Sequence, residues 1–348
     1  MNVCLVTPAP ARSRKGNRVT ALRWARILRG LGHRVAIEQE YRGPGGTGVG
    51  LTEGSSRTAG PGARPGRRCD LLVALHARRS FASIERFSRD HPDRPLILAL
   101  TGTDLYGDIH TDPLAQRALE LATRLIVLQP MGSQELPPHL RDRVRVIYQS
   151  AAAPPGEFAP KRGVFEVCVL GHLRPVKDPF RTALAARLLP AASRIQVVHI
   201  GAALEDEMAA QACAEMHANR RYRWLGELPR WQALRRLARS RLLALTSHLE
   251  GGANVVSEAI AAGVPVVSSR ISGSTGILGP DYPGYFPAGD TAALAALLER
   301  AEGDAGFNRT LKEWCERLRP LVDPARERLS WEQLLRELCA QTPRGEAA

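Results

Sequence analysis

The feature that most constrains the fold of this chain is an alternation of short apolar runs with segments of helical periodicity. The apolar run 2–7 is followed by a loop, by apolar residues at helical spacing over 20–31, and by a second apolar run at 35–37. A strand, a helix and a second strand in this order form a parallel pair with a crossover connection. Because the alternation recurs along the chain, the sequence predicts an α/β fold with parallel sheets.

The length of the chain predicts two domains. With 348 residues it exceeds what one ordinary hydrophobic core supports. The proline-rich segment 151–160 is the natural linker. We predict an N-terminal Rossmann-like domain over 1–153, a C-terminal Rossmann-like domain over 161–322, and a closing helix over 325–340 that crosses back to the N-terminal domain. The segment 42–68, rich in Gly, Pro, Ser and Arg, has no apolar period and is predicted to be a flexible surface insertion. The glycine-rich segment 271–279 is predicted to be a loop.

Composition narrows the class of protein. Hydrophobic residues make up 44% and charged residues 24% of the chain, which is typical of soluble globular proteins. The net charge of +13 raises the question of nucleic acid, but the arginines are spread along the chain and no nucleic-acid-binding motif accompanies them. The six cysteines are scattered without a CxxC pair, which favours reduced thiols. We therefore expect a cytoplasmic protein without nucleic-acid partners or stable membrane insertion.

The stretch 246–268 (TSHLEGGANVVSEAIAAGVPVVS) carries the strongest chemical signal. It is predicted to be a strand end, a glycine-bearing loop, a short helix and another strand. Gly251 and Gly252 allow unusual dihedrals and a close approach of ligand, while Glu250 and Glu258 can accept hydrogen bonds from sugar hydroxyls. The helix is expected to open at a phosphate-binding row of amides, those of Ala253, Asn254 and Val255. Together these features predict a nucleotide-sugar site.

A second glycine loop follows the predicted strand 165–170 and begins at Gly171. It carries Arg174, whose guanidinium offers a bidentate fork, and Lys177, which offers a point charge. Such a pair suits the diphosphate of a leaving group. Since the carboxyl ends of parallel strands share one edge of a sheet, this loop is expected to meet the Glu250 loop. No metal-binding motif is present, so we expect no metal and no cofactor, with cationic side chains stabilising the diphosphate instead.

These two motifs resemble the family-4-like group of GT-B glycosyltransferases. In that group an E-x7-E element binds the donor, and a G-x5-K loop with an arginine binds the donor diphosphate; the spacings from Glu250 to Glu258 and from Gly171 to Lys177 match. The resemblance implies a GT-B fold, two Rossmann-like domains facing across a cleft. It places Glu258 on the ribose diol and Glu250 on the donor sugar. Glu250, Arg174 and Lys177 are then the expected catalytic residues.

The chain departs from the pattern of that group at two positions. His172 follows Gly171 where relatives usually have arginine, and Arg174 comes two residues later. Thr101 precedes Gly102 where relatives often have histidine. The second departure leaves the identity of any catalytic base open.

A narrower resemblance rests on several segments taken together: TPAPARSRKGNRVTALRW, ALHARRS, LTGTDLY, GHLRPVKDP and EGGANVVSEA. They are similar to the selenosugar synthases of selenoneine biosynthesis. The resemblance implies transfer of a sugar, notably N-acetylglucosamine, from a UDP-sugar to selenophosphate, with formation of a selenium–carbon bond. So small and anionic an acceptor calls for phosphate-binding loops in the N-terminal domain. The expected acceptor-binding residues are Arg14, Lys15, Gly16, Asn17, Arg18, Thr20, Arg78, Arg79, Thr103 and Asp104.

Three other functions remain open at this stage. The first is an ordinary glycosyltransferase with a hydroxyl acceptor in lipid or polysaccharide synthesis, for which the arginine-bearing helix 20–31 is a candidate membrane contact. The second is a GT-B-shaped UDP-sugar epimerase, and the third a non-catalytic basic binding protein. The sequence determines neither the anomeric outcome nor the sugar preference.

Overall fold

The computed structural model describes residues 1–11, 13, 16–43 and 69–341. The predicted acceptor residues Arg14 and Lys15, and most of the predicted insertion, lie outside the described residues. The chain divides into two units, each built around one six-stranded sheet. Unit 1 comprises Met1–Leu128, Ser133–Ile147 and the chain from Arg328 onward, and unit 2 comprises Gln129–Gly132 and Tyr148–Glu327.

The sheet of unit 1 has the strand order β2-β1-β3-β4-β5-β6, and all of its pairings are parallel. Its strands are β1 (Asn2–Val6), β2 (Arg34–Glu38), β3 (Leu71–Leu75), β4 (Leu96–Ala99), β5 (Arg124–Val127) and β6 (Val144–Val146). β2 is added on one side of β1, and β3 with all later strands on the other. The strand order therefore reverses between β1 and β3.

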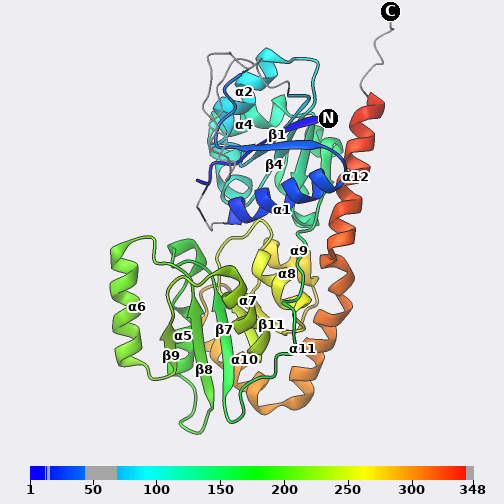
Figure 1. The fold of residues 1–348 in the computed structure, drawn as a ribbon. Helices are drawn as coiled ribbons and strands as arrows, with labels where there is room; N and C mark the ends of the chain where they lie inside the picture. Colours follow the sequence, from blue (N-terminus) through cyan, green and yellow to red (C-terminus); the bar gives the residue numbers. More distant parts are fainter. Residues whose placement is uncertain (12, 14–15, 44–68, 342–348) are drawn as a thin grey trace, which may run out of the picture. The chain divides into compact units, whose positions relative to one another are not determined.

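Helices cover both faces of this sheet (Figure 1). They are α1 (Gly16–Gly30) and α12 (Pro324–Gln341) on one face, and α2 (Phe81–Asp90) and α4 (Pro113–Leu121) on the other. Trp331, Leu334, Leu335 and Leu338 follow helical spacing along α12 and are buried on the sheet beside α1. The Trp331 ring meets the Trp24 ring edge to face at a centroid distance of 5.0 Å. The last helix of the chain thus completes the core of the first unit.

The sheet of unit 2 has the order β12-β11-β10-β7-β8-β9, again with parallel pairings throughout. Its strands are β7 (Phe165–Leu170), β8 (Ile195–Ile200), β9 (Tyr222–Trp224), β10 (Leu242–Leu245), β11 (Val266–Ser269) and β12 (Tyr285–Phe286). Its longer helices are α5 (Arg181–Arg187), α6 (Asp206–Ala218), α7 (Arg230–Arg239), α8 (Asn254–Ala261), α9 (Ser272–Leu278), α10 (Thr291–Gly303) and α11 (Ala305–Arg317). Strand order reverses between β7 and β10. The predicted architecture of two Rossmann-like units is confirmed.

One local prediction was wrong. The glycine-rich segment 271–279 was expected to be a loop, but it forms helix α9. Its glycines are needed for packing rather than for a turn: a Cβ at Gly273 would lie 1.9 Å from the Glu250 carbonyl oxygen, and one at Gly276 would lie 1.9 Å from Oε1 of Gln129. Tertiary contact therefore outweighs the low helix propensity of glycine here.

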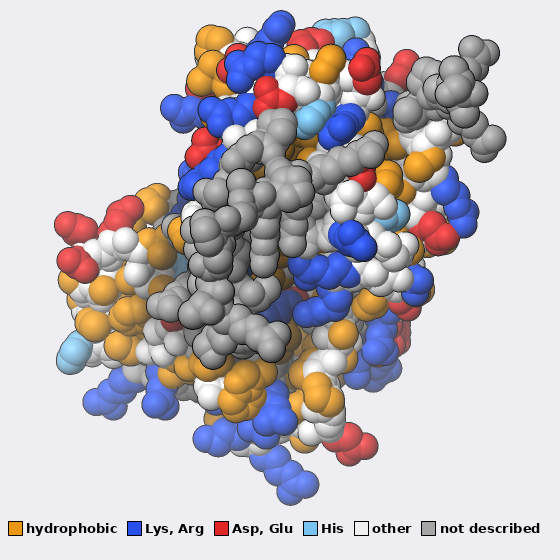
Figure 2. Space-filling model, turned by 45° about the horizontal axis from the view of Figure 1, so that its top comes forward, with side chains coloured by type: hydrophobic (Ala, Val, Ile, Leu, Met, Phe, Trp, Pro, Cys, Tyr) orange, Lys and Arg blue, Asp and Glu red, His pale blue; other side chains and the backbone are white. Residues whose placement is uncertain are grey.

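The basic side chains do not form one continuous patch on the face shown in Figure 2, as expected from arginines spread along the chain. Lys and Arg side chains lie in several separate places on the face shown in Figure 2, interspersed with apolar and acidic ones. Among the described helices, none has the length and apolar character needed to cross a bilayer.

We predict that Trp331→Ala destabilises unit 1 by about 3–5 kcal/mol, because it removes a fully buried indole and leaves a cavity between α1, α12 and the sheet. The free energy of unfolding in urea checks this. Leu329→Ala is the matched control on the same helix, since Leu329 is 49% exposed, and it should change stability by less than about 0.5 kcal/mol. Equal effects of the two variants would contradict the assigned packing.

Gly273→Ala is expected to destabilise unit 2 by about 1–3 kcal/mol, because the new methyl group would overlap the Glu250 carbonyl and push the two segments apart. Gly303→Ala provides the control: Gly303 also lies in a helix, and a Cβ there meets nothing within 4 Å. The thermal unfolding midpoints of the two variants are compared with that of the wild type. A Gly273→Ala protein as stable as the control would show that α9 does not pack on the Glu250 segment as described.

Candidate active site

In unit 2 the candidate site lies where the chain leaves β7 and β10. These strands are paired neighbours, and the strand order reverses between them. Open parallel sheets bind ligands outside the carboxyl ends of their strands at such a switch point. The β7 loop (171–178) carries Arg174 and Lys177, and the β10 loop (246–253) carries Glu250. The topology therefore places the two predicted motifs at one edge of the sheet.

Lys177 and Glu250 join the two loops directly. The Lys177 ammonium forms an ion pair with Oε1 of Glu250, and the Ser247 hydroxyl donates to the same oxygen at 2.7 Å. The Glu250 side chain is 10% exposed and that of Lys177 32%. Ser269 of β11 steadies the loop by donating its hydroxyl to the Ser247 carbonyl at 2.6 Å. Glu250 is thus held in place, with its charge balanced by a cation that a diphosphate can also use.

The far end of the β7 loop is attached to the end of β10. The Thr246 hydroxyl lies 3.0 Å from the Lys177 carbonyl oxygen and 2.9 Å from that of Asp178. Asp178 adopts a left-handed conformation with φ of 45°, and its carboxylate accepts from Nε of Arg181 at 2.7 Å. Arg174 lies between the two ends of the loop, half-buried, and no carboxylate of the described residues pairs with it. Its guanidinium is available to an anion.

Glu258 lies in α8 and is only 4% exposed. Its Oε1 is 2.6 Å from Nη1 of Arg230, the first residue of α7, whose side chain is 49% exposed. Sequence reasoning missed Arg230, because nothing in its spacing links it to Glu258 and only the packing of α7 beside α8 brings them together. A sugar hydroxyl that uses Glu258 therefore has to share the carboxylate with Arg230.

The start of α8 has features that suit anion binding, but the two glycines before it differ from their predicted conformation. Ala253 is the N-cap, and its side chain makes no capping hydrogen bond; Asn254 and Val255 in the first turn are half-buried. An N-cap residue that offers no side-chain acceptor leaves the helix start suited to an external anion. Gly251 and Gly252, however, adopt no positive φ. The expectation that they supply unusual backbone dihedrals was wrong, and what remains is the absence of side chains at this approach.

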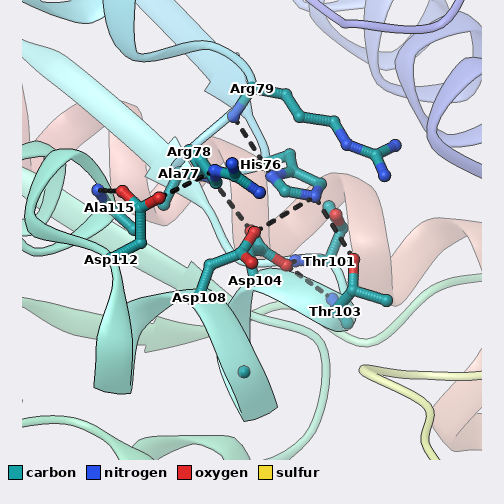
Figure 3. A network of polar contacts seen from close by, with 12 residues as sticks. His76, Ala77, Arg78, Arg79, Thr101, Thr103, Asp104, Asp108, Asp112 and Ala115 are labelled. Carbon is teal, nitrogen blue, oxygen red and sulfur yellow. Dashed lines mark hydrogen bonds and ion pairs between the residues drawn. The ribbon is translucent and has the colours of Figure 1, made fainter.

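In unit 1 the corresponding switch point lies between β1 and β3, and His76 follows β3 directly. His76 is 2% exposed and has a φ of 76°, which is strained for a residue other than glycine. Its Nδ1 accepts from the Arg79 amide at 3.4 Å, and its Nε2 faces the Thr103 hydroxyl at 3.3 Å and the Asp108 carboxylate at 3.9 Å (Figure 3). Burial lowers the pKa of His76. A neutral histidine thus organises the loop after β3.

Asp104 was predicted to contact the acceptor, but the structure gives it another role. It begins a short π-helix (Asp104–Asp108) and is fully buried. Its carboxylate accepts from the amides of Ala77 at 3.0 Å, Thr101 at 2.9 Å and Gly102 at 2.8 Å (Figure 3). Three backbone donors balance this buried charge. Asp104 thus holds the loops after β3 and β4 together.

The cations of this region differ in their partners. Nε of Arg78 lies 2.7 Å from the Asp112 carboxylate, whereas the exposed Arg79 side chain has no ion-pair partner among the described residues (Figure 3). Arg18 is half-buried in the first turn of α1, with a buried Nε that has no hydrogen-bond partner, and burial lowers its pKa. Gly16 and Asn17 precede Arg18 in that turn, while Thr20 is buried. Arg18 and Arg79 are thus the cations left available to an anion.

No three His, Cys, Asp or Glu side chains are grouped to hold a metal ion in the part of the chain that the structure describes.

Comparisons with known proteins place this geometry in context. Residues 156–317 match the protein-family model described as "Glycosyl transferases group 1". Over the whole chain the structure resembles Anabaena HepE (Alr3699) in complex with UDP, with a TM-score of 0.74 at 16% identity, covering 97% of this chain and 100% of that one. It also resembles sucrose-phosphate synthase (tll1590) from Thermosynechococcus elongatus, with a TM-score of 0.73 at 18% identity, covering 97% and 99%.

A search of curated protein sequences found no significant match. At these identities the structural likeness establishes the fold, and the two units of the chain have the GT-B fold. Within that fold, residues 156–317 are similar to the glycosyl transferases group 1 family.

Proposed function

We propose that this chain is a selenosugar synthase, which transfers a sugar, N-acetylglucosamine, from a UDP-sugar to selenophosphate. The observation that carries the donor half of the proposal is the ion pair between Lys177 and Glu250 at the switch point of unit 2, with Arg174 in the same loop as Lys177. This unit is similar to the glycosyl transferases group 1 family. Structures of HepE in complex with UDP and with UDP-glucose support a UDP-sugar donor for this fold. The acceptor rests on the unpaired cations of unit 1 and on the resemblance of the loop sequences.

Donor binding requires an exchange of partners in unit 2. The diphosphate takes the Lys177 ammonium, now paired with Glu250, and the unpaired Arg174 adds a bidentate fork. Glu250, released from Lys177 but still held by Ser247, can then accept hydrogen bonds from hydroxyls of the donor sugar. The two cations also stabilise the negative charge that develops on the departing diphosphate.

The proposed anionic acceptor is supported by two positively charged side chains of unit 1, Arg18 and Arg79. A helix N-terminus normally favours acidic side chains, yet the first turn of α1 contains Arg18 and no acidic residue. A bound anion would reconcile the cation with the positive end of the helix. Arg79 is exposed after β3 and has no ion-pair partner in the part of the chain that the structure describes, so it supplies a second cation at the same switch point. This arrangement suits a small, multiply charged oxyanion such as selenophosphate.

In the proposed reaction a selenium lone pair attacks the anomeric carbon of the sugar, and a selenium–carbon bond forms. The bond from that carbon to the diphosphate oxygen breaks, and its electron pair leaves with UDP. No oxidation or reduction is needed. A selenium nucleophile needs less help from a base than a hydroxyl does, in keeping with a chain whose sequence leaves the base unassigned.

The decisive assay incubates the purified protein with UDP-N-acetylglucosamine in three arms: without an acceptor, with selenophosphate, and with hydroxyl acceptors in its place. We expect UDP release only when selenophosphate is present, together with a selenium glycoside detected by mass spectrometry. UDP release with hydroxyl acceptors but not with selenophosphate would establish the ordinary glycosyltransferase instead. Conversion of the donor alone would establish the epimerase, and no turnover in any arm would overturn the proposal.

For the donor half, Lys177→Ala should weaken UDP binding about 10- to 100-fold, because it removes a charge-assisted contact to the diphosphate. Isothermal titration calorimetry measures the dissociation constant. Arg309→Ala, which removes an exposed cation from α11, is the control and should leave it unchanged. Unchanged UDP affinity in Lys177→Ala would remove Lys177 from the donor site.

For the acceptor half, Arg79→Ala should raise the KM for selenophosphate about tenfold while leaving UDP affinity unchanged. Arg89→Ala is the matched control, since Arg89 is an exposed cation elsewhere in the same unit. Steady-state kinetics at saturating donor separates the effects on KM and kcat. An equal KM in the two variants would show that Arg79 does not bind the acceptor.

A further inference from the structure

A buried histidine holds the near end of the β7 loop. His199 belongs to β8 and is 1% exposed. Its Nε2 lies 3.0 Å from the Gly171 carbonyl oxygen, and its Nδ1 lies 3.1 Å from the Tyr222 hydroxyl of β9. Gly171 is the residue at which the chain leaves β7 and turns toward Arg174 and Lys177. The contact therefore acts on the first peptide of the loop that carries the cations.

The partners of His199 determine its tautomer. A carbonyl oxygen can only accept, so Nε2 carries the proton and donates to Gly171. In a neutral imidazole Nδ1 is then the acceptor, and the Tyr222 hydroxyl donates to it. Burial lowers the pKa of His199 to about 4 and raises that of Tyr222. The chain of donors from Tyr222 through His199 to Gly171 is thus fully defined near neutral pH.

The surrounding backbone is arranged to allow this contact. A Cβ at Gly201 would lie 1.9 Å from the Gly171 carbonyl oxygen, so only glycine at position 201 leaves room for that carbonyl. The Trp224 indole donates to the Gly201 carbonyl at 2.8 Å. The Ala202 amide donates to Nδ1 of His172 at 3.1 Å, and the Leu173 amide donates to the Ala202 carbonyl at 2.9 Å. The end of β8 therefore serves as a template for the first three residues of the β7 loop.

We propose that His199 is a positioning residue for diphosphate binding, which orients the Gly171 peptide and thereby the segment that presents Arg174 and Lys177. This inference rests on the proposed function, because it assigns a ligand to those cations. Thr246 holds the far end of the loop through the Lys177 and Asp178 carbonyls, and His199 holds the near end. With both ends attached, less conformational entropy is lost when the cations close on an anion. His199 itself is too deeply buried to touch the ligand.

The test compares His199→Leu, which removes both hydrogen bonds, with His199→Gln, whose amide can still donate to Gly171. Val198→Ala is the stability control: Val198 precedes His199 on β8 and is 3% exposed, so the change opens a cavity without touching the loop. At a temperature where all variants are folded, we expect UDP affinity to fall about tenfold in His199→Leu, equivalent to about 1.4 kcal/mol. It should return to within about threefold of the wild-type value in His199→Gln and stay unchanged in Val198→Ala.

Amide hydrogen exchange without ligand keeps this test separate from the proposed function. In His199→Leu the hydrogen-bonded amides of the β7 loop, those of Gly171, Leu173, Lys177 and Asp178, should exchange faster than in Val198→Ala. Equal exchange in the two variants would overturn the positioning role, whatever UDP does. Faster exchange in a protein whose wild type fails to bind UDP would sustain the role of His199 in the loop but reject its assignment to a diphosphate, and with it the proposed donor.

Discussion

The ion pair between Lys177 and Glu250 is the interaction on which the proposed donor site depends. It joins the loops that follow β7 and β10, the two neighbouring strands between which the order of the sheet reverses. Without a ligand, each charge compensates the other in a partly buried setting where an unpaired charge would be costly. The same pairing holds both side chains at the place where a diphosphate sugar would meet them. The site is thus preorganised by a contact that the ligand must take apart.

Glu258 repeats this arrangement with Arg230. Both carboxylates of the E-x7-E element are therefore neutralised by a basic side chain from another segment. A donor that brings two phosphate charges can draw Lys177 away and leave Glu250 free for hydroxyls. A ribose is neutral and does not compete with Glu258 for Arg230, so that ion pair would remain in place. Under the proposed function the two carboxylates would therefore differ, with Glu250 changing its partner and Glu258 sharing the one it has.

The sequence predicted β1, β2, β7, α1 and α12, because their apolar periods are those of buried parallel strands and covering helices. It also predicted the contact between the Gly171 and Glu250 loops, since parallel strands end at one edge. The failures share a physical cause. Helix α9 is glycine-rich because other atoms lie within 1.9 Å of the missing Cβ positions, and Arg230 and His199 act through packing across elements. Local patterns do not encode such contacts, which appear only once the segments are assembled.

The loops after β3 and β7 are each held by a buried side chain, but the two side chains differ in charge and in hydrogen-bonding role. A loop that binds an anion needs a fixed backbone and a free cation. In unit 1 a buried anion, Asp104, accepts hydrogen bonds from three backbone amides, and Arg79 in the loop after β3 forms no ion pair with any described residue. In unit 2 a buried neutral donor, His199, holds a backbone carbonyl, and Arg174 in the loop after β7 likewise has no described carboxylate as a partner. The charge of Asp104 is compensated by its three amide donors, and the buried imidazole of His199 is neutral, so neither anchor pairs with the cationic side chain of its loop.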